Sequence, residues 1–318
     1  MQMPRAGVDG QRNQVSIDSL IKFWPLMYSI IQEFWNITEP QIEDAAVRNN
    51  IPIELYLYSE LGLDRFSIQD FQRRDPYSNP ERFEKLFVRL NVKGWIEPMA
   101  DGSFQVTIKA REAARSLIQA GDVQLSDFAS LPDQDLKRLL ALLKQLVMEC
   151  CVTPEPPGKW AILKRFRVAD EHYPPVMQIR EYLMDLFAYR DDSHLSASRP
   201  QFNDAGIVWI VLGGLWIGDM VNAEQMAERM AFRGHDVADY EIAIQAAMEL
   251  GWAEPAERPA QRAFRLTEQG RLLREQAEQL TNAYFYIPWS VLTQAETNEL
   301  YDLLTRLRDA LSKYRKSG

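Results

Sequence analysis

The stretch Gly251-Trp252-Ala253-Glu254-Pro255, followed by Phe264-Arg265-Leu266-Thr267, decides the fold of this chain because it occurs twice. The earlier copy is Gly94-Trp95-Ile96-Glu97-Pro98, followed by Phe104-Gln105-Val106-Thr107. The copies are 157 residues apart at the Gly-Trp pair and 160 apart at the threonine, so only a short insertion in the intervening turn separates them. Two copies of one supersecondary unit in a single polypeptide predict an internal pseudo-dimer.

Composition sets the broad class of the protein. A length of 318 residues, of which 46% are apolar and 25% charged, has room for two globular domains, each with its own core. We expect no signal peptide, and the most apolar stretch, 207–220, is too short and too rich in glycine to span a bilayer. The two cysteines, Cys150 and Cys151, are adjacent, which argues against a disulfide framework or a zinc site. The sequence therefore predicts a soluble, reduced, cytoplasmic protein.

The net charge of −9 opposes binding to nucleic acid, which depends on Lys and Arg at the phosphates. An acidic chain can still bind DNA through a local basic face. The position of the charges therefore matters more than their sum.

Hydrophobic spacing and turn signals predict mainly α structure with small β-wings. Residues 1–15 are expected to form a flexible tail. The first unit, 16–151, is expected to contain these elements: helices at 17–35, 51–61, 67–74 and 80–94, a hairpin at 95–108, and helices at 110–128 and 133–151. Ser67 and Asn79 are the predicted N-caps of two of these helices, and Pro80 opens the second.

A connector with five prolines, 152–175, is the best domain boundary in the chain. The second unit, 176–318, repeats the order of the first. Its expected elements are a helix at 176–188, a polar stretch at 189–195, helices at 204–216, 222–230 and 237–250, a hairpin at 252–266, and helices at 268–283 and 294–314.

Three helices followed by a two-stranded wing, flanked by long helices, resemble the MarR-type winged helix-turn-helix regulators. The resemblance is carried by Gly251-Trp252 at the end of the third helix and by Leu266-Thr267-Glu268-Gln269-Gly270-Arg271-Leu272-Leu273 after the wing. The second copy is the closer match, because the same segment has drifted in the first copy to Val106-Thr107-Ile108-Lys109-Ala110-Arg111. The resemblance implies tandem winged-helix domains whose terminal interface helices pair within one chain.

The resemblance makes the third helix of each unit a candidate DNA reader, and charge distinguishes the two. Residues 72–93 have a net charge of +3, whereas residues 235–251 contain four carboxylates and no Lys or Arg. Carboxylates in a major groove would repel phosphates. The candidate DNA-binding residues of the first unit are Arg73, Arg74, Arg82, Lys85 and Arg89. A solvated helix face of mixed charge explains them equally well.

In the family, an Arg near the tip of the wing enters the minor groove. The first wing has no Arg at its tip, while the second has Arg258 and Arg262. The first copy thus has a basic helix without a basic wing, and the second has the reverse. The pattern predicts either an asymmetric DNA reader or the loss of DNA binding from both copies.

The densest ionisable cluster is Arg190-Asp191-Asp192-Ser193-His194, followed by Arg199. A His beside two carboxylates can form a pH-sensitive or effector-binding site, with Asp191, Asp192, His194 and Arg199 as the candidates. Capping and ion pairing in a polar turn is the simpler interpretation. With three His in the chain and no paired ligand spacing, we expect no metal site.

The chain has no Gly-rich phosphate loop and no GxSxG or HExxH motif, so we expect a protein that is not an enzyme and needs no cofactor. The best-supported function is a transcriptional regulator that binds double-stranded DNA at an asymmetric site and could respond to a small apolar or aromatic effector. The alternative is a tandem winged-helix scaffold that binds a protein partner and no DNA. No membrane association is expected.

Overall fold

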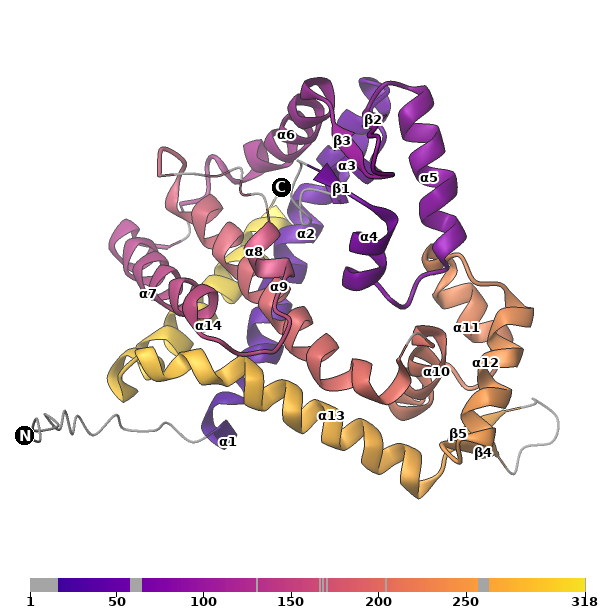
Figure 1. Ribbon diagram of the computed structural model, residues 1–318. Coiled ribbons are helices and arrows are strands. Elements are labelled where there is room, and N and C mark those ends of the chain that lie inside the picture. Colours follow the sequence, from indigo (N-terminus) through magenta and orange to yellow (C-terminus); the bar gives the residue numbers. More distant parts are fainter. Residues whose placement is uncertain are drawn as a thin grey trace, which may run out of the picture.

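The computed structural model describes residues 17–57, 65–129, 131–165, 167, 169, 171–203, 205–256 and 263–317. The predicted tail at 1–15 and residues 58–61 of the helix predicted at 51–61 lie outside these ranges. The described chain is mainly helical with two small antiparallel sheets, which confirms the predicted class (Figure 1).

The first half comprises these elements: α1 (Ile17–Leu20), α2 (Phe23–Arg48), α3 (Glu54–Leu57), β1 (Arg65–Phe66), α4 (Ile68–Arg74), α5 (Pro80–Val92), β2 (Ile96–Pro98), β3 (Phe104–Val106), α6 (Ile108–Asp122), η2 (Val123–Leu125) and α7 (Asp133–Val152). The connector contains α8 (Ala161–Lys164). The second half comprises α9 (Pro175–Phe202), α10 (Gly206–Ile217), α11 (Ala223–Arg229), η3 (Ala231–Arg233), α12 (Val237–Glu249), β4 (Ala253–Pro255), β5 (Phe264–Leu266), α13 (Glu268–Tyr286), η5 (Ile287–Val291) and α14 (Gln294–Ser317).

Both halves run in the same order from a long helix through three shorter helices and a hairpin to two more long helices. The hairpins also have matching registers, with Ile96 opposite Val106 in the first and Ala253 opposite Leu266 in the second. The first hairpin gains a third strand, β1, which pairs with β3 and buries Phe66. The sequence pattern did not predict this strand.

The Gly-Trp pair has the same geometry at the start of each hairpin. Gly94 and Gly251 have φ angles of +70° and +74°, a left-handed conformation that favours glycine after a helix. The following Trp95 and Trp252 each donate their N–H to the last turn of the preceding helix and bury their indole rings. In both halves, this geometry ends the helix and turns the chain into the hairpin.

The helix that follows each hairpin also starts in the same way. Thr107 and Thr267 are the N-caps of α6 and α13, and each hydroxyl accepts the N–H three residues later, from Ala110 and Gly270. A Cβ at Gly270 would lie 2.1 Å from the Trp252 carbonyl oxygen, so this position needs glycine because of a close approach to the hairpin.

The described residues form three main hydrophobic cores. The largest, which we call the body, is built by α2, α7, α9, α14 and the end of α13, so both halves contribute to it. Within it, α2 packs against α14, and α9 packs against α7 (Figure 1). A second core lies in the first lobe, which we define as α3 to β3, and a third lies in the second lobe, defined as α10 to β5.

Two helices extend well beyond their predicted ends. α2 continues past Trp35 to Arg48 because Ile42 is buried against α6, so the later turns have a partner. α9 continues through the stretch 189–195 that was expected to be a polar turn, and that expectation is wrong. Arg190, Asp191 and Asp192 bond to α13, α4 and α8, so the later turns of the helix are stabilised by neighbouring elements.

The connector is ordered by contacts with both halves. The N–H groups of Ala161 and Ile162 donate to the carboxylate of Asp192 on α9, at 2.9 and 3.1 Å. The Lys159 ammonium donates to the carbonyls of Cys150, at 2.7 Å, and of Thr153, at 2.5 Å, which end α7. These bonds fix the path of the chain between the halves.

Candidate nucleic-acid interface

Helix α5 begins as its sequence predicts. The Asn79 side chain accepts the N–H of Glu81, and Pro80 occupies the first turn, where its missing N–H removes no helical hydrogen bond. Phe83 and Phe87 are buried in the first lobe. The opposite face of α5 is therefore turned to solvent with its charged side chains.

The basic residues on that face are partly engaged. Lys85 Nζ lies 3.0 Å from Glu81 Oε2, and Arg89 pairs with Glu54 of α3. The side chains of Lys85 and Arg89 are 77% and 55% exposed, so such pairs contribute only about 0–1 kcal/mol and can be exchanged for contacts with phosphate. Arg82 is half-buried beside the second lobe.

Arg73 and Arg74, at the end of α4, lie against α9 and the connector. The Arg74 guanidinium donates to Asp191, and the Arg73 guanidinium donates to the Gly158 carbonyl at 3.4 Å. In turn, Arg199 donates to the Arg73 carbonyl at 2.5 Å. The structure thus brings two residues of the predicted DNA-binding set into contact with two residues of the predicted effector set.

In the second half, α12 occupies the place that α5 has in the first. Asp236 and Asp239 form a capping box in which each side chain accepts the backbone N–H of the other, at 2.9 and 3.1 Å. Two of the four predicted carboxylates therefore serve to start the helix. The exposed face of α12 carries acidic residues and Ile242, which is 70% exposed. Arg258 and Arg262, predicted for the second wing, lie outside the described residues.

The two lobes touch at the turn that precedes α5. The Arg233 guanidinium lies 2.6 Å from Asp75 Oδ1 and stacks over the ring of Tyr77. The Asn79 N–H donates to the Arg233 carbonyl at 2.9 Å, and His235 Nε2 lies 2.9 Å from the Tyr77 carbonyl. We call these five residues the lobe junction.

The same turn packs closely on the start of α10. A Cβ at Gly206 would lie 2.1 Å from the Pro76 carbonyl oxygen and 2.7 Å from its carbon, so the approach requires glycine. The lobe junction and this contact together fix the position of α5 relative to α12 (Figure 1).

The lobe junction limits the distance between the starts of α5 and α12. Asn79 is the N-cap of α5 and bonds to Arg233, three residues before Asp236, the N-cap of α12. Since consecutive Cα atoms are about 3.8 Å apart and the hydrogen-bonded link adds about 7 Å, the two N-caps are at most roughly 18 Å apart. Symmetric helix-turn-helix dimers place their reading helices about 34 Å apart. The two helix starts therefore cannot enter successive major grooves in this conformation.

The predicted effector cluster lies within α9 instead of in a loop. Asp191 pairs with Arg74, and Asp192 accepts two backbone N–H groups of α8. Burial, with smaller contributions from the positive charges of Arg274 and Arg190, lowers the pKa of His194 to about 3. The ring is therefore neutral at physiological pH, and Trp209 Nε1 donates to its Nε2 at 3.4 Å.

A cavity of about 460 Å³ lies between the first lobe, α9 and the lobe junction. Its aromatic lining consists of Phe71, Tyr77, Phe83, Phe187 and Phe232. Its ionisable lining consists of Glu54, Arg74, Asp75, Arg82, Asp191, His194 and Arg233. The volume is within the range of about 300–1,000 Å³ that is usual for small-molecule sites.

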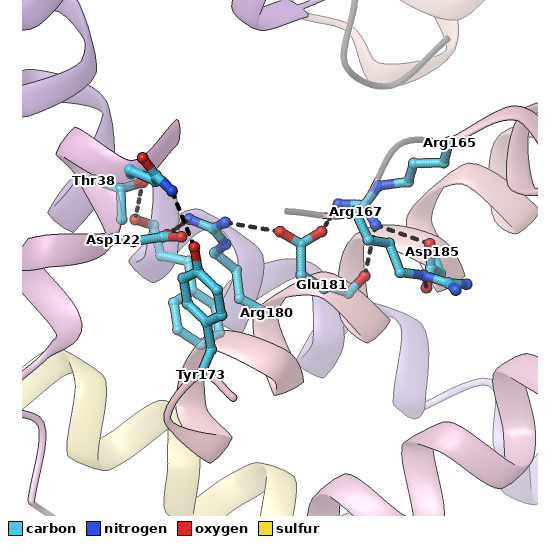
Figure 2. A network of polar contacts seen from close by, with 10 residues as sticks. Thr38, Asp122, Arg165, Arg167, Tyr173, Arg180, Glu181 and Asp185 are labelled. Carbon is cyan, nitrogen blue, oxygen red and sulfur yellow. Dashed lines mark hydrogen bonds and ion pairs between the residues drawn. The ribbon is translucent and has the colours of Figure 1, made fainter. Parts of the chain in front are cut away.

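A buried ionic network joins the end of α6 to α9 and the connector (Figure 2). Arg180 pairs with Asp122 and, at 3.0 Å, with Glu181, while Arg165 bridges Glu181 and Asp185 at 2.5 and 2.8 Å. Burial raises the pKa of Asp122 to about 6, against the opposing effect of Arg180. With Arg167, which lies 2.5 Å from Asp185, the network has three arginines and three carboxylates and holds the end of α6 against α9 and the connector. No pattern in the sequence predicted it.

Comparison with known protein families identifies one type of domain in the chain. A helix-turn-helix family model matches residues 190–315, from the middle of α9 to near the end of α14. The second half therefore contains a helix-turn-helix domain. No curated protein and no solved structure shows a significant match to the chain.

Two further findings concern only the described residues. No helix among them is long and apolar enough to cross a membrane. No group of three or more His, Cys, Asp or Glu side chains is placed there to hold a metal ion.

The lobe junction and the role of Gly206 were not predicted from the sequence. Asp75, Pro76 and Tyr77 fall between the helices predicted at 67–74 and 80–94, and the aromatic ring of Tyr77 is the one feature of this polar segment that indicates a buried contact. The partners Arg233 and His235 are each 158 positions away, beyond the range of local sequence patterns.

Proposed function

We propose that the chain is a DNA-binding transcriptional regulator in which two MarR-like winged-helix units, 16–151 and 176–318, pair within one polypeptide. The helix-turn-helix match over 190–315 is the observation that carries this proposal. The repeated element order and the shared Gly-Trp geometry support the extension to the first half. The packing of α2 on α14 and of α9 on α7 corresponds to the exchange of terminal helices expected of a dimer.

The reading surface in this proposal is asymmetric. Lys85 and Arg89 on α5 are exposed and basic, whereas the exposed face of α12 is acidic. The short distance between the two helix starts also disfavours a palindromic site. We therefore propose that α5 contacts the DNA, with Arg82 at the edge of the contact and Arg258 and Arg262 as candidate wing contacts.

The second candidate function is a scaffold that binds a protein and no DNA. The observation that favours it is the outer face of α12, where Ile242 is exposed among carboxylates and the helix contains no Lys or Arg. Such a surface suits a partner with both basic and apolar side chains.

The cavity of 460 Å³ supports a role for a small aromatic effector. Its lining joins α4 and α5 to α9 and to Arg233 of the lobe junction, so a ligand there would contact both lobes at once. Occupation of the cavity would therefore favour one relative position of α5 and α12 over others.

The experiment is a fluorescence-anisotropy titration of genomic duplex fragments at low and physiological salt. The regulator proposal predicts saturable binding that weakens steeply as salt rises, because phosphate contacts release counterions. The absence of salt-sensitive binding at micromolar protein would reject the regulator and leave the scaffold.

A matched pair of variants tests the reading surface. Lys85→Glu reverses an exposed charge on α5, where Lys85 pairs with Glu81 one turn earlier. Lys137→Glu makes the same change on α7, where Lys137 pairs with Asp133 in the same spacing. We expect Lys85→Glu to weaken DNA binding at least about tenfold and Lys137→Glu to have little effect. Equal effects would show that α5 is not the reading helix.

A further inference from the structure

We propose that the groove around Arg73 and Arg199 binds a small phosphorylated aromatic ligand of the nucleoside monophosphate type. The groove consists of two cavities of about 480 Å³ each, which share Arg73, Arg199 and Asn203 in their walls. It lies where the end of α4, the connector and the end of α9 meet. This groove adjoins the aromatic cavity described above, with Arg74 and Leu195 in the walls of both, and its occupation does not depend on whether the chain binds DNA.

Electrostatics indicate an anion. The guanidinium groups of Arg73 and Arg199 donate to backbone carbonyls, those of Gly158 and Arg73 respectively, and neither pairs with a carboxylate of the described chain. Asp192, the carboxylate in the groove wall, is bonded to the N–H groups that start α8. Arg73 and Arg199 thus bring two guanidinium charges into a concave site whose wall also holds the Asp192 carboxylate and Arg74, which pairs with Asp191.

The identity of the cations favours phosphate over a carboxylate. Arg presents a planar set of donors that matches phosphate oxygens, and a phosphomonoester has a charge close to −2, equal and opposite to that of the two guanidinium groups. The start of α10 lines the far end of the groove, and its partial positive charge has the same sign. A monocarboxylate would neutralise only one of the two arginines.

The rest of the groove suits an aromatic ring. Trp160 and Tyr284 line the cavity on the connector side, together with the apolar side chains of Pro157 and Leu195. Both aromatic residues are only half-buried, so their rings retain surface that a ligand can cover. Aromatic side chains stack on any nucleobase, since every base has a π-face. A nucleotide whose phosphate contacts the arginines and whose base stacks on Trp160 therefore contacts both ends of this cavity.

The test measures ligand binding directly, by calorimetric titration of the full chain with AMP, GMP, CMP and UMP at physiological salt. The matching nucleosides and inorganic phosphate are titrated in parallel. We expect at least one monophosphate to bind with a Kd below about 1 mM and more tightly than either its nucleoside or inorganic phosphate. If no monophosphate binds, the proposal is wrong.

Variants locate the site. Arg199→Gln should weaken the monophosphate about 10- to 100-fold, the usual effect of losing a charged hydrogen-bonding partner. Arg199→Lys keeps the charge and should recover part of the affinity. Arg229→Gln, which removes an exposed guanidinium of the second lobe, should leave binding unchanged. Equal affinities of Arg199→Gln and Arg229→Gln would place the ligand elsewhere and overturn the assignment.

Two further measurements test the position of the base and the source of the phosphate. Trp160→Leu should weaken the binding of the monophosphate but leave the affinity for inorganic phosphate as it was; equal losses would contradict the stacking role.

Duplex DNA is a second source of phosphate, so its affinity for Arg199→Gln is measured as well. If Arg199→Gln weakens duplex binding while no mononucleotide binds, the groove is a DNA contact and the nucleotide proposal fails. Nucleotide binding without DNA binding would instead reject only the proposed regulator.

Discussion

Replacement of Gly206 by alanine tests whether the two lobes meet at the turn before α5. The added Cβ would lie 2.1 Å from the Pro76 carbonyl oxygen, whereas ordinary contacts begin near 3.4 Å, so this turn would have to move by more than 1 Å. Both partners are backbone atoms and cannot avoid the clash by changing rotamer. Forced overpacking of this kind costs about 1–3 kcal/mol.

The matched control is Gly213→Ala in the same helix. A Cβ at Gly213 meets no atom within 4 Å, so this substitution should only gain helix propensity, about 0.5–1 kcal/mol of stability. The two variants should therefore differ in unfolding free energy by roughly 2–4 kcal/mol, with Gly206→Ala the less stable.

Urea unfolding followed by circular dichroism measures this difference, and hydrogen exchange of the Asn79 amide reports on the lobe junction itself. We expect the Asn79 amide, which donates to Arg233, to exchange faster in Gly206→Ala than in Gly213→Ala. If the two variants have equal stability and equal protection at Asn79, the lobes do not pack against each other at this turn.

Three more predictions concern other contacts. Because the pKa of Asp122 is raised from 3.8 to about 6, the folded chain holds this proton more tightly than the unfolded chain does. Relative to Asp122→Asn, the wild type should thus lose up to about 3 kcal/mol of stability as pH rises from about 4 to 7, and a pH-independent difference in urea titrations would contradict this. Gly270→Ala should cost about 1–3 kcal/mol, because its Cβ would lie 2.1 Å from the Trp252 carbonyl oxygen, and an unchanged Tm would refute that contact. Arg233→Ala should cost about 1–2 kcal/mol through the lost ion pair and ring stacking, and unaltered exchange at Asn79 would show that Arg233 does not hold the junction.

Local chemistry made much of the fold predictable. Ser67 caps α4, Asn79 and Pro80 start α5, and Gly94 and Gly251 begin the hairpins, because each of these effects acts within a few residues. The lengths of α2 and α9 were underestimated because those helices are extended by partners distant in sequence. Arg190 in α9, for example, donates to Asn282 of α13 at 2.7 Å.

The candidate site was predictable only in its charge. The contrast between a basic α5 and an acidic α12 follows from composition alone and is present in the structure. The inward position of Arg74 could not be foreseen, because its partner Asp191 is 117 residues away and belongs to a stretch that was expected to be a loop. The identity of the DNA contacts stays a prediction.

The ion pair between Asp75 and Arg233 has an evolutionary consequence. Its residues are 158 positions apart, and so are Tyr77 and His235, close to the 157-residue spacing of the Gly-Trp pairs. If the halves are duplicated copies, each of these residues touches the position next to its own counterpart, since the N-caps Asn79 and Asp236 are 157 positions apart. In a homodimer both copies of each position are identical, so this turn would face an identical turn across the two-fold axis. Joining two copies in one gene frees the positions to diverge into opposite charges. Opposite charges then favour pairing of the first half with the second half over pairing of two identical halves.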